Sequence, residues 1–256
     1  MQFGAQLWTH AIFLVIVAGA VYAQAVTGFA LALILLGLVG ATNLVPLTDA
    51  VNATTVIGLS TAWTFLWRRR ALYVERMIVP TLVASAVGIV AGALLLTWLA
   101  DTAYQVLRLI LGIAIVACAL SLWRAVRALP ALSSAAVFAA TGGIAGIMAG
   151  MFAAPGPPLV YLLYRQPLSF ARIQNALMVI FGLGTALRLL IVVPSGQFSL
   201  LSLQLAAEAL PVVFVVTSYA ARRPPPLSPR LLKVLICALL IATGLSMGIS
   251  ALLAMH

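Results

Sequence analysis

Residues 52–62, NATTVIGLSTA, return 123 positions later as residues 175–186, NALMVIFGLGTA, with one residue inserted. The same spacing separates Phe29-Ala30 from Phe152-Ala153, and a glycine-containing apolar stretch precedes each pair. Such a repeat is typical of a duplicated structural unit, and in membrane proteins duplicated units usually enclose a transport pathway. The sequence therefore predicts two related halves.

The composition predicts a membrane protein. Hydrophobic residues make up 64% of the 256 residues and charged residues only 7%, and the mean hydropathy is +1.21. A helix that crosses a bilayer needs about 20 apolar residues, and the chain offers a series of uncharged runs of about that length without an alternating strand pattern. We therefore predict an all-α integral membrane protein with a single transmembrane domain over residues 1–256.

Ten apolar segments are expected to be helical. Residues 124–133, with Arg124, Arg127 and Pro130, form the polar break between the halves, so we expect a first repeat at 1–123, a linker at 124–133 and a second repeat at 134–256. The predicted segments are 7–24, 29–40, 51–67, 77–99, 104–123, 134–152, 156–164, 173–193, 201–220 and 234–254.

The positions of the basic residues predict the topology, because positively charged loops remain on the cytoplasmic side. Loops 41–50, 100–102 and 194–200 contain no Lys or Arg and are expected to be external, which also places both termini outside. All basic residues except Arg108 and Arg188 fall into four clusters, namely Arg68, Arg69, Arg70 and Arg76; Arg124 and Arg127; Arg165 and Arg172; and Arg222, Arg223, Arg230 and Lys233.

Equivalent loops of the two halves carry different charge. Arg68, Arg69 and Arg70 follow the first copy of the repeated helix, whereas loop 194–200 follows the second copy without any charge. The halves are therefore predicted to be inverted-topology repeats, related by an axis in the membrane plane, with about five helical segments each. A parallel repeat or an accidental similarity is the alternative.

Each half opens with a long apolar stretch that is interrupted midway, at Thr27-Gly28 and at residues 154–158, APGPP. Proline removes backbone donors and breaks a helix, so each stretch is expected to fold back as a hairpin. Segments 29–40 and 156–164, at about 1.5 Å per residue, reach only about 18 and 14 Å. Whether these hairpins span or re-enter the membrane stays open.

Broken helices place backbone N–H groups and positive dipole ends inside the membrane, where they can hold an anion. Thr27, Gly28, Gly156 and Tyr161 are the candidate binding residues at the two breaks. A proline kink or a close glycine-mediated helix contact would explain the same residues without a ligand.

Polar residues within the apolar spans extend the candidate site, because such residues usually face protein or a water-filled cavity. Asn52 and Asn175 begin the two copies of the repeat, and with Thr55 and Thr185 they are expected to line one pseudo-symmetric cavity. Helix N-capping is the alternative role of the two asparagines.

Arg188 and Glu208 lie at similar distances from loop 194–200. The simpler interpretation is a structural ion pair between neighbouring helices. The alternative is functional, in that Arg188 attracts the anion while Glu208 competes for Arg188 and takes a proton, which would couple proton movement to transport.

The two breaks also resemble a known family. Thr27-Gly28-Phe29 and residues 150–161, GMFAAPGPPLVY, are similar to the Gly-rich, Phe-containing turns of the sulfite exporter TauE/SafE permeases, with Gly-Pro-Pro-Leu-Val-Tyr the most specific part. Arg172 matches a basic residue before the next helix, and Leu210-Pro211 with Arg222-Arg223 match a later pattern. Residues 29–32, FALA, and Ala153-Ala154 depart from the family's glycines. The resemblance implies gradient-driven export of small anions, typically sulfite or organosulfonates.

Other functions find little support. His10 and His256 cannot form a metal site or a catalytic triad, no Walker motif is present, and no cofactor is expected. The net charge of +10 is explained by topology signals and anionic lipid headgroups, so no nucleic-acid partner is predicted. A bacterial inner membrane fits the absence of a targeting extension, and homodimer formation stays open.

The sequence thus predicts a secondary transporter that exports sulfite or an organosulfonate such as sulfoacetate by alternating access, coupled to a proton or ion gradient. Arg165 and Arg172 are expected to guide the anion in from the cytoplasm. A passive anion channel on the same scaffold, a permease for small carboxylates and, with least support, an intramembrane enzyme are the alternatives.

Overall fold

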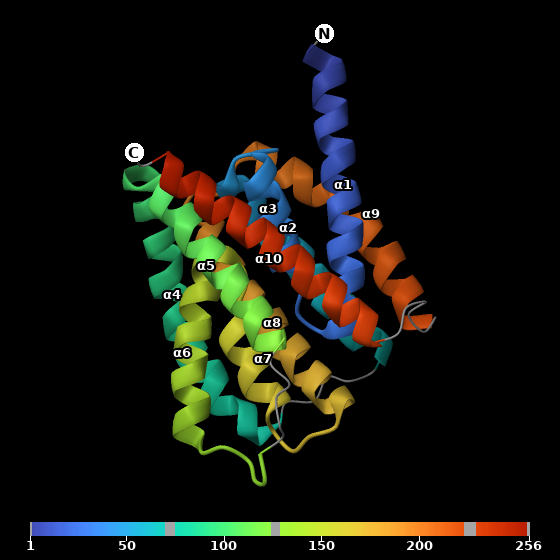
Figure 1. The fold of residues 1–256 in the computed structure, drawn as a ribbon, viewed down its shortest axis with the longest axis vertical. Coiled ribbons are helices and arrows are strands. Elements are labelled where there is room, and N and C mark those ends of the chain that lie inside the picture. The colour runs from blue at the N-terminus through green and yellow to red at the C-terminus, as the bar shows by residue number, and fades with distance from the viewer. Residues whose placement is uncertain (1, 70–74, 124–128, 223–228, 255–256) are drawn as a thin grey trace.

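A computed structural model describes residues 2–69, 75–123, 129–222 and 229–254, and these residues form helices and no strands (Figure 1). Arg70, residues 124–128 of the expected linker, and Arg223 lie outside the described residues. The helices are α1 Gln2–Thr27, α2 Leu31–Thr42, α3 Leu47–Arg69, the 3-10 helix η1 Arg76–Ile78, α4 Val79–Thr102, α5 Tyr104–Trp123, α6 Ala135–Phe152, α7 Gly156–Tyr164, α8 Phe170–Val192, α9 Leu200–Arg222 and α10 Pro229–Leu253.

The predicted all-α membrane fold is confirmed. Each of the ten predicted segments corresponds to one α-helix of the described chain, and the bounds of α5 and α7 agree to the residue. Six of these helices are long and apolar enough to cross a membrane, and α2 and α5 are shorter apolar helices. Trp8, Trp63, Trp67 and Trp98 are more than half exposed, as is typical of side chains at a membrane interface.

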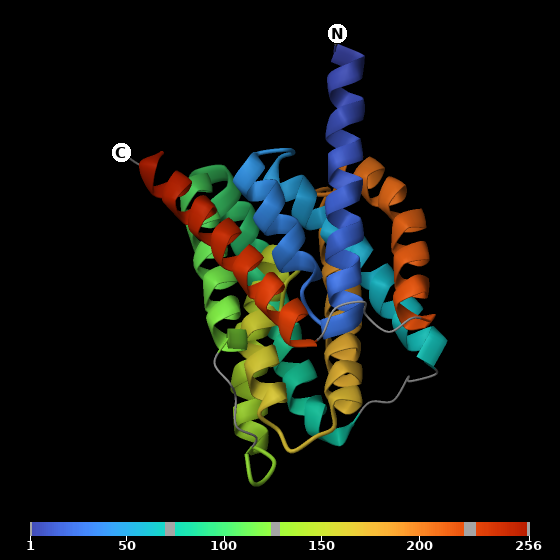
Figure 2. The ribbon, with the colours of Figure 1, turned by 45° about the vertical axis from the view of Figure 1, so that its right-hand side comes forward.

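Both termini lie at one end of the molecule, which we call the terminal end (Figures 1 and 2). The hairpin of α1 and α2 reaches in from the terminal end, and the hairpin of α6 and α7 reaches in from the other end. Helices α3, α5, α7 and α9 run toward that other end, which we call the basic end because Arg68, Arg165 and Arg222 lie at or near the C-terminal ends of three of them. The assignment of the basic end to the cytoplasm stays a prediction.

Each hairpin turns at one residue in the left-handed region. The first is Gly28, with φ of 92°, directly after α1, and the second is Ala153, with φ of 51°, directly after α6. Gly28 adopts this conformation without a Cβ clash, whereas Ala153 adopts it at some cost. The turns therefore align Gly28 with Ala153. The expected equivalence of Phe29-Ala30 with Phe152-Ala153 is wrong, because Phe29-Ala30 follows the first turn whereas Phe152-Ala153 includes the turn residue of the second.

Helix pairs are in close contact where glycines face a neighbouring backbone. Along α6, an added Cβ at Gly146 would lie 2.4 Å from the Ser85 carbonyl oxygen, and one at Gly150 would lie 2.3 Å from the Ile89 carbonyl oxygen of α4. Helices α5 and α10 meet in the same way at Gly112 and Gly244. Small residues that let backbones approach are a main source of helix association in membranes.

We expect Gly146→Ala to lower the free energy of unfolding by about 1–3 kcal/mol, because the new methyl group must push α4 away from α6. Gly143→Ala is the matched control, since nothing lies within 4 Å of its added Cβ. Thermal unfolding of the two detergent-solubilised variants, followed by size-exclusion fluorescence, measures the difference. Equal melting temperatures would show that α4 and α6 are not in such close contact.

Candidate functional site

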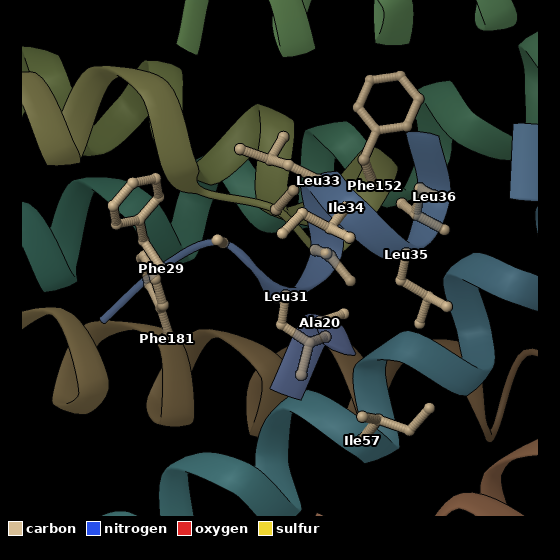
Figure 3. Close-up of a cluster of buried hydrophobic side chains, with 14 of the residues drawn as sticks. Ala20, Phe29, Leu31, Leu33, Ile34, Leu35, Leu36, Ile57, Phe152 and Phe181 are labelled. Carbon is tan, nitrogen blue, oxygen red and sulfur yellow. The ribbon is translucent and has the colours of Figure 1, made fainter. Parts of the chain in front are cut away.

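A small cavity lies between the turns of the two hairpins. It is bounded by Gln24 of α1, by residues that follow the first turn, by residues 153–156 at and after the second turn, and by Gly58 of α3 and Thr185 of α8. The space open to the centre of a water molecule is about 20 Å³, which holds roughly one water. Figure 3 shows Phe29 and Phe181 beside the first turn and Leu31 and Leu33 at the start of α2. The cavity is therefore apolar for the most part and closed in this conformation.

The first turns of both short helices line this cavity. Helix α2 contributes Leu31, Ala32 and Leu33, and α7 contributes Gly156. Gln24 Oε1 accepts the N–H of Leu31 at 3.2 Å, whereas the N–H groups of Ala32 and Leu33 belong to a first turn, which has no acceptors within the helix itself. Pro157 and Pro158 supply no N–H to α7. The α2 end thus offers more donors than the α7 end, and both ends offer a positive dipole.

The threonines expected at the site donate to their own helices in this conformation. Thr185 Oγ1 donates to the carbonyl oxygen of Phe181 at 2.7 Å, and Thr27 Oγ1 donates to that of Ala23 at 2.6 Å. Thr55 Oγ1 donates to Val51 in the same way at 3.0 Å. Only Thr185 among them lines the cavity. Its hydroxyl would have to rotate before it could donate to an anion.

Arg188 lies one turn beyond Thr185 on α8 and is 1% exposed. Its guanidinium donates to the Gly150 carbonyl oxygen at 2.8 Å, to Asn52 Oδ1 at 3.2 Å and to Thr55 Oγ1. Asn52 Nδ2 donates in turn to the Gln197 carbonyl oxygen at 2.8 Å. The network joins the end of α6 to α3, to α8 and to the loop before α9.

The expected ion pair between Arg188 and Glu208 is wrong. Glu208 Oε2 lies 2.7 Å from His10 Nδ1 of α1, whereas Arg188 contacts α3 and α6. Similar distances from loop 194–200 place the two side chains at a similar depth. Depth does not determine which face of a helix a residue occupies, because each residue turns the helix by about 100°.

The N-cap alternative for the two asparagines is also wrong, because Asn52 and Asn175 lie within α3 and α8, which begin at Leu47 and Phe170. The two residues also do not share a cavity. Asn52 contacts Arg188, which is 13 residues along α8 from Asn175, or about 20 Å at 1.5 Å per residue. Helices α3 and α8 run in opposite directions, so their first turns lie at opposite ends and positions near those turns are far apart (Figures 1 and 2).

Toward the basic end, side chains of α7 and α8 hold the end of α1. Tyr164 donates its hydroxyl to the Thr27 carbonyl oxygen at 3.0 Å, and Gln174 Nε2 donates to that of Ala25 at 2.9 Å. Gly28 packs against the same glutamine, with an added Cβ 3.3 Å from Gln174 Cγ. Sequence reasoning missed Gln24, Tyr164 and Gln174, although an uncharged polar residue inside an apolar span is itself a signal.

The basic residues expected at the cytoplasmic entrance have different partners. Arg165 donates to the Tyr161 hydroxyl at 3.0 Å, and Tyr161 is 42% exposed and does not line the cavity. Arg172 forms a bidentate ion pair with Glu75, at 2.8 and 2.9 Å. Glu75 is buried and was not expected at the site, although it is the one acidic residue within the first basic cluster.

Comparison with known proteins identifies the family, because residues 11–247 match the sulfite exporter TauE/SafE family. The chain belongs to this family. A protein of Cupriavidus necator described as a probable sulfite/organosulfonate exporter TauE is 30% identical over 231 residues, which cover 90% of each chain. No solved structure matches. Members of the family are exporters and not enzymes, and six membrane-length helices make this member a multi-pass membrane protein.

Replacing Arg188 by methionine is expected to lower the free energy of unfolding by at least about 1–3 kcal/mol, because buried acceptors on Asn52 and Gly150 lose their donor. Arg165→Met is the control, since among the described residues the Arg165 side chain bonds to the exposed Tyr161 hydroxyl and to no buried group. Chemical or thermal unfolding of the purified variants measures both values. A stable Arg188→Met protein that fails only in transport would assign Arg188 to the substrate alone.

Proposed function

We propose that this member of the TauE/SafE family is a secondary transporter that exports sulfite or an organosulfonate, such as sulfoacetate, across the bacterial inner membrane by alternating access. The observation that carries the proposal is the cavity into which the first turns of α2 and α7 both point. The family and the similar protein of C. necator support a sulfur-containing anion as the substrate.

Alternating access requires two units that exchange roles, and the packing of the helices is consistent with inverted halves. Helix α4 packs along α6 as α9 packs along α1, and α2 contacts α10 as α7 contacts α5. Helices α3 and α8, which carry the repeated sequence, contact each other. In the proposed mechanism the cavity lies on the pseudo-symmetry axis and opens first to one side and then to the other.

Binding in this cavity would rest on partial charges. The N-terminal dipoles of α2 and α7 and the first-turn N–H groups of α2 attract an anion without a buried cation in direct contact. Such a site can bind a small anion and still release it. With room for about one water, the cavity has to widen before it admits a sulfite or sulfonate group. In the proposed mechanism this conformation would be an occluded state.

The remaining candidate residues are proposed to act on the two routes into the cavity. Arg188, Asn52 and Thr55 connect the end of α6 to α3 on the side of the terminal end. On the side of the basic end, Tyr161 and Arg165 are proposed to meet the incoming anion. There the ion pair of Arg172 with Glu75 joins α8 to the segment before α4, and this ion pair would have to break when the basic side opens. Asn175 lies one turn after Arg172 on α8.

Saturable movement of a sulfur oxyanion or sulfonate is the expected result when purified protein in liposomes is given sulfite, several sulfonates and matched carboxylates.

Gly58→Ala should slow this transport about tenfold, because a methyl group that must be accommodated in a filled site costs about 1–3 kcal/mol. Gly19→Ala is the control, since its added Cβ meets nothing within 4 Å.

Counterflow separates the alternatives, because a carrier exchanges labelled for unlabelled substrate and a passive channel does not. Transport of carboxylates alone would favour the carboxylate permease. Movement of no anion at all would contradict the proposed function.

Coupling is proposed to involve Glu208 with His10 as its partner in place of Arg188. The two side chains are 26% and 41% exposed, for His10 and Glu208 respectively, and join α1 of the first hairpin to α9. A proton that binds this pair would change the contact between α1 and α9. Because α1 also carries Gln24 at the cavity, the proton and the anion could act on the same helix.

If this coupling is right, Glu208→Gln keeps the fold but loses the stimulation of transport by an imposed proton gradient. His10→Gln should have the same effect, because either change removes one member of the pair. Transport rates measured with and without the gradient, over a series of pH values, test this expectation. Equal stimulation of the variant and the unchanged protein would exclude Glu208 from coupling.

A further inference from the structure

A second hollow lies outside the hairpin cavity, at the basic end between α3 and α9. The two helices pack against each other, and their C-terminal ends lie side by side in both views (Figures 1 and 2). The hollow has a volume of about 470 Å³, much larger than the cavity between the hairpins. It is lined by Arg68, Phe214, Val215, Ser218, Tyr219 and Arg222.

The polar part of this hollow is positively charged, and the part of the chain that the structure describes places no counter-charge in it. Neither ion pair of the described residues involves Arg68 or Arg222, and no acidic side chain lines the hollow. The Arg68 guanidinium carbon lies 5.2 Å from the centre of the Phe214 ring, so the guanidinium group is directed toward α9. Arg68 Nε and Ser218 Oγ are shielded from solvent and have no hydrogen-bond partner in the described part of the chain.

The other wall of the hollow is apolar and faces outward. Phe214 is 51% exposed, Val215 64% and Tyr219 49%. All three lie near the end of α9, one of the six membrane-length helices, and in a chain that crosses a membrane such side chains face lipid. Exposed Trp63 and Trp67 on the last turns of α3 mark the same level as a membrane interface.

We propose that this hollow binds the headgroup of an anionic phospholipid. Two arginines suit a phosphate, because guanidinium groups donate paired, charge-assisted hydrogen bonds to its oxygens. Ser218 adds a hydroxyl donor, and an acyl chain would lie along Phe214 and Val215. A free phosphate or sulfite ion would use the arginines but not the apolar wall, so the combination specifies a lipid. Anionic lipids are attracted to basic residues at the cytoplasmic surface of a membrane.

The site is tested with purified protein in neutral detergent. Phosphatidylglycerol, phosphatidylcholine, inorganic phosphate and sulfite are added separately, and retained adducts are detected by native mass spectrometry together with the shift in melting temperature. The expected result is a retained phosphatidylglycerol and a raised melting temperature, with smaller effects of phosphatidylcholine. An equal shift with phosphate or sulfite would overturn the proposal in favour of a soluble-anion site.

The variants separate this site from general attraction by basic loops. Arg68→Gln combined with Arg222→Gln should weaken phosphatidylglycerol binding roughly tenfold or more, as expected when hydrogen bonds to a charged group are lost. Arg76→Gln is the matched control, because Arg76 is exposed near the basic end but does not line the hollow.

Ser218→Leu provides a second test, since it removes the hydroxyl donor, places a bulkier side chain in the hollow and keeps both arginines. It should also reduce binding, and it stays informative if the double variant does not fold. Unchanged phosphatidylglycerol binding by Ser218→Leu or by the double variant would overturn the proposal.

Discussion

The structure depends on a backbone constraint. Two helices, α1 and α6, end at the hairpin turns beside the cavity. A buried carbonyl group that is left there without a donor would cost several kcal/mol. Helix α8 supplies a donor for each end, with Gln174 on the Ala25 carbonyl oxygen of α1 and Arg188 on the Gly150 carbonyl oxygen of α6. Tyr164 of α7 adds a second donor at the end of α1. Two broken helices can therefore exist at the cavity because one unbroken helix passes beside both of them.

The same constraint explains how two arginines are buried without carboxylates. Arg108 donates to the Gly40 carbonyl oxygen near the end of α2 and to Ser250 Oγ, each at 3.0 Å, and Arg188 donates near the end of α6. A helix C-terminus carries partial negative charge, which stabilises a nearby cation. Because these partners are dipoles, no carboxylate in the described part of the chain cancels the positive charges of Arg108 and Arg188.

The sequence was sufficient for those features that depend on position along the chain. Apolar runs predicted the helices, the APGPP break predicted the start of α7, and the loop charges grouped the helix ends that the structure brings to one end. Features that depend on the direction of a side chain were not predictable. Glu208 faces His10 rather than Arg188, because the depth of a residue says nothing about the face of the helix that it occupies.

The two halves differ in how firmly their hairpins are held. In the second half, Gly142, Gly146 and Gly150 bring the backbone of α6 against α4 over most of its length. In the first half, Gly19 of α1 is exposed and makes no such contact with α9, and the pair of His10 with Glu208 joins the two helices. Separating backbones in close contact loses many dispersion contacts at once, whereas parting one polar pair loses few. If the halves exchange roles during transport, α1 is therefore the helix that moves more easily, and the second hairpin with α4 is the frame against which it moves.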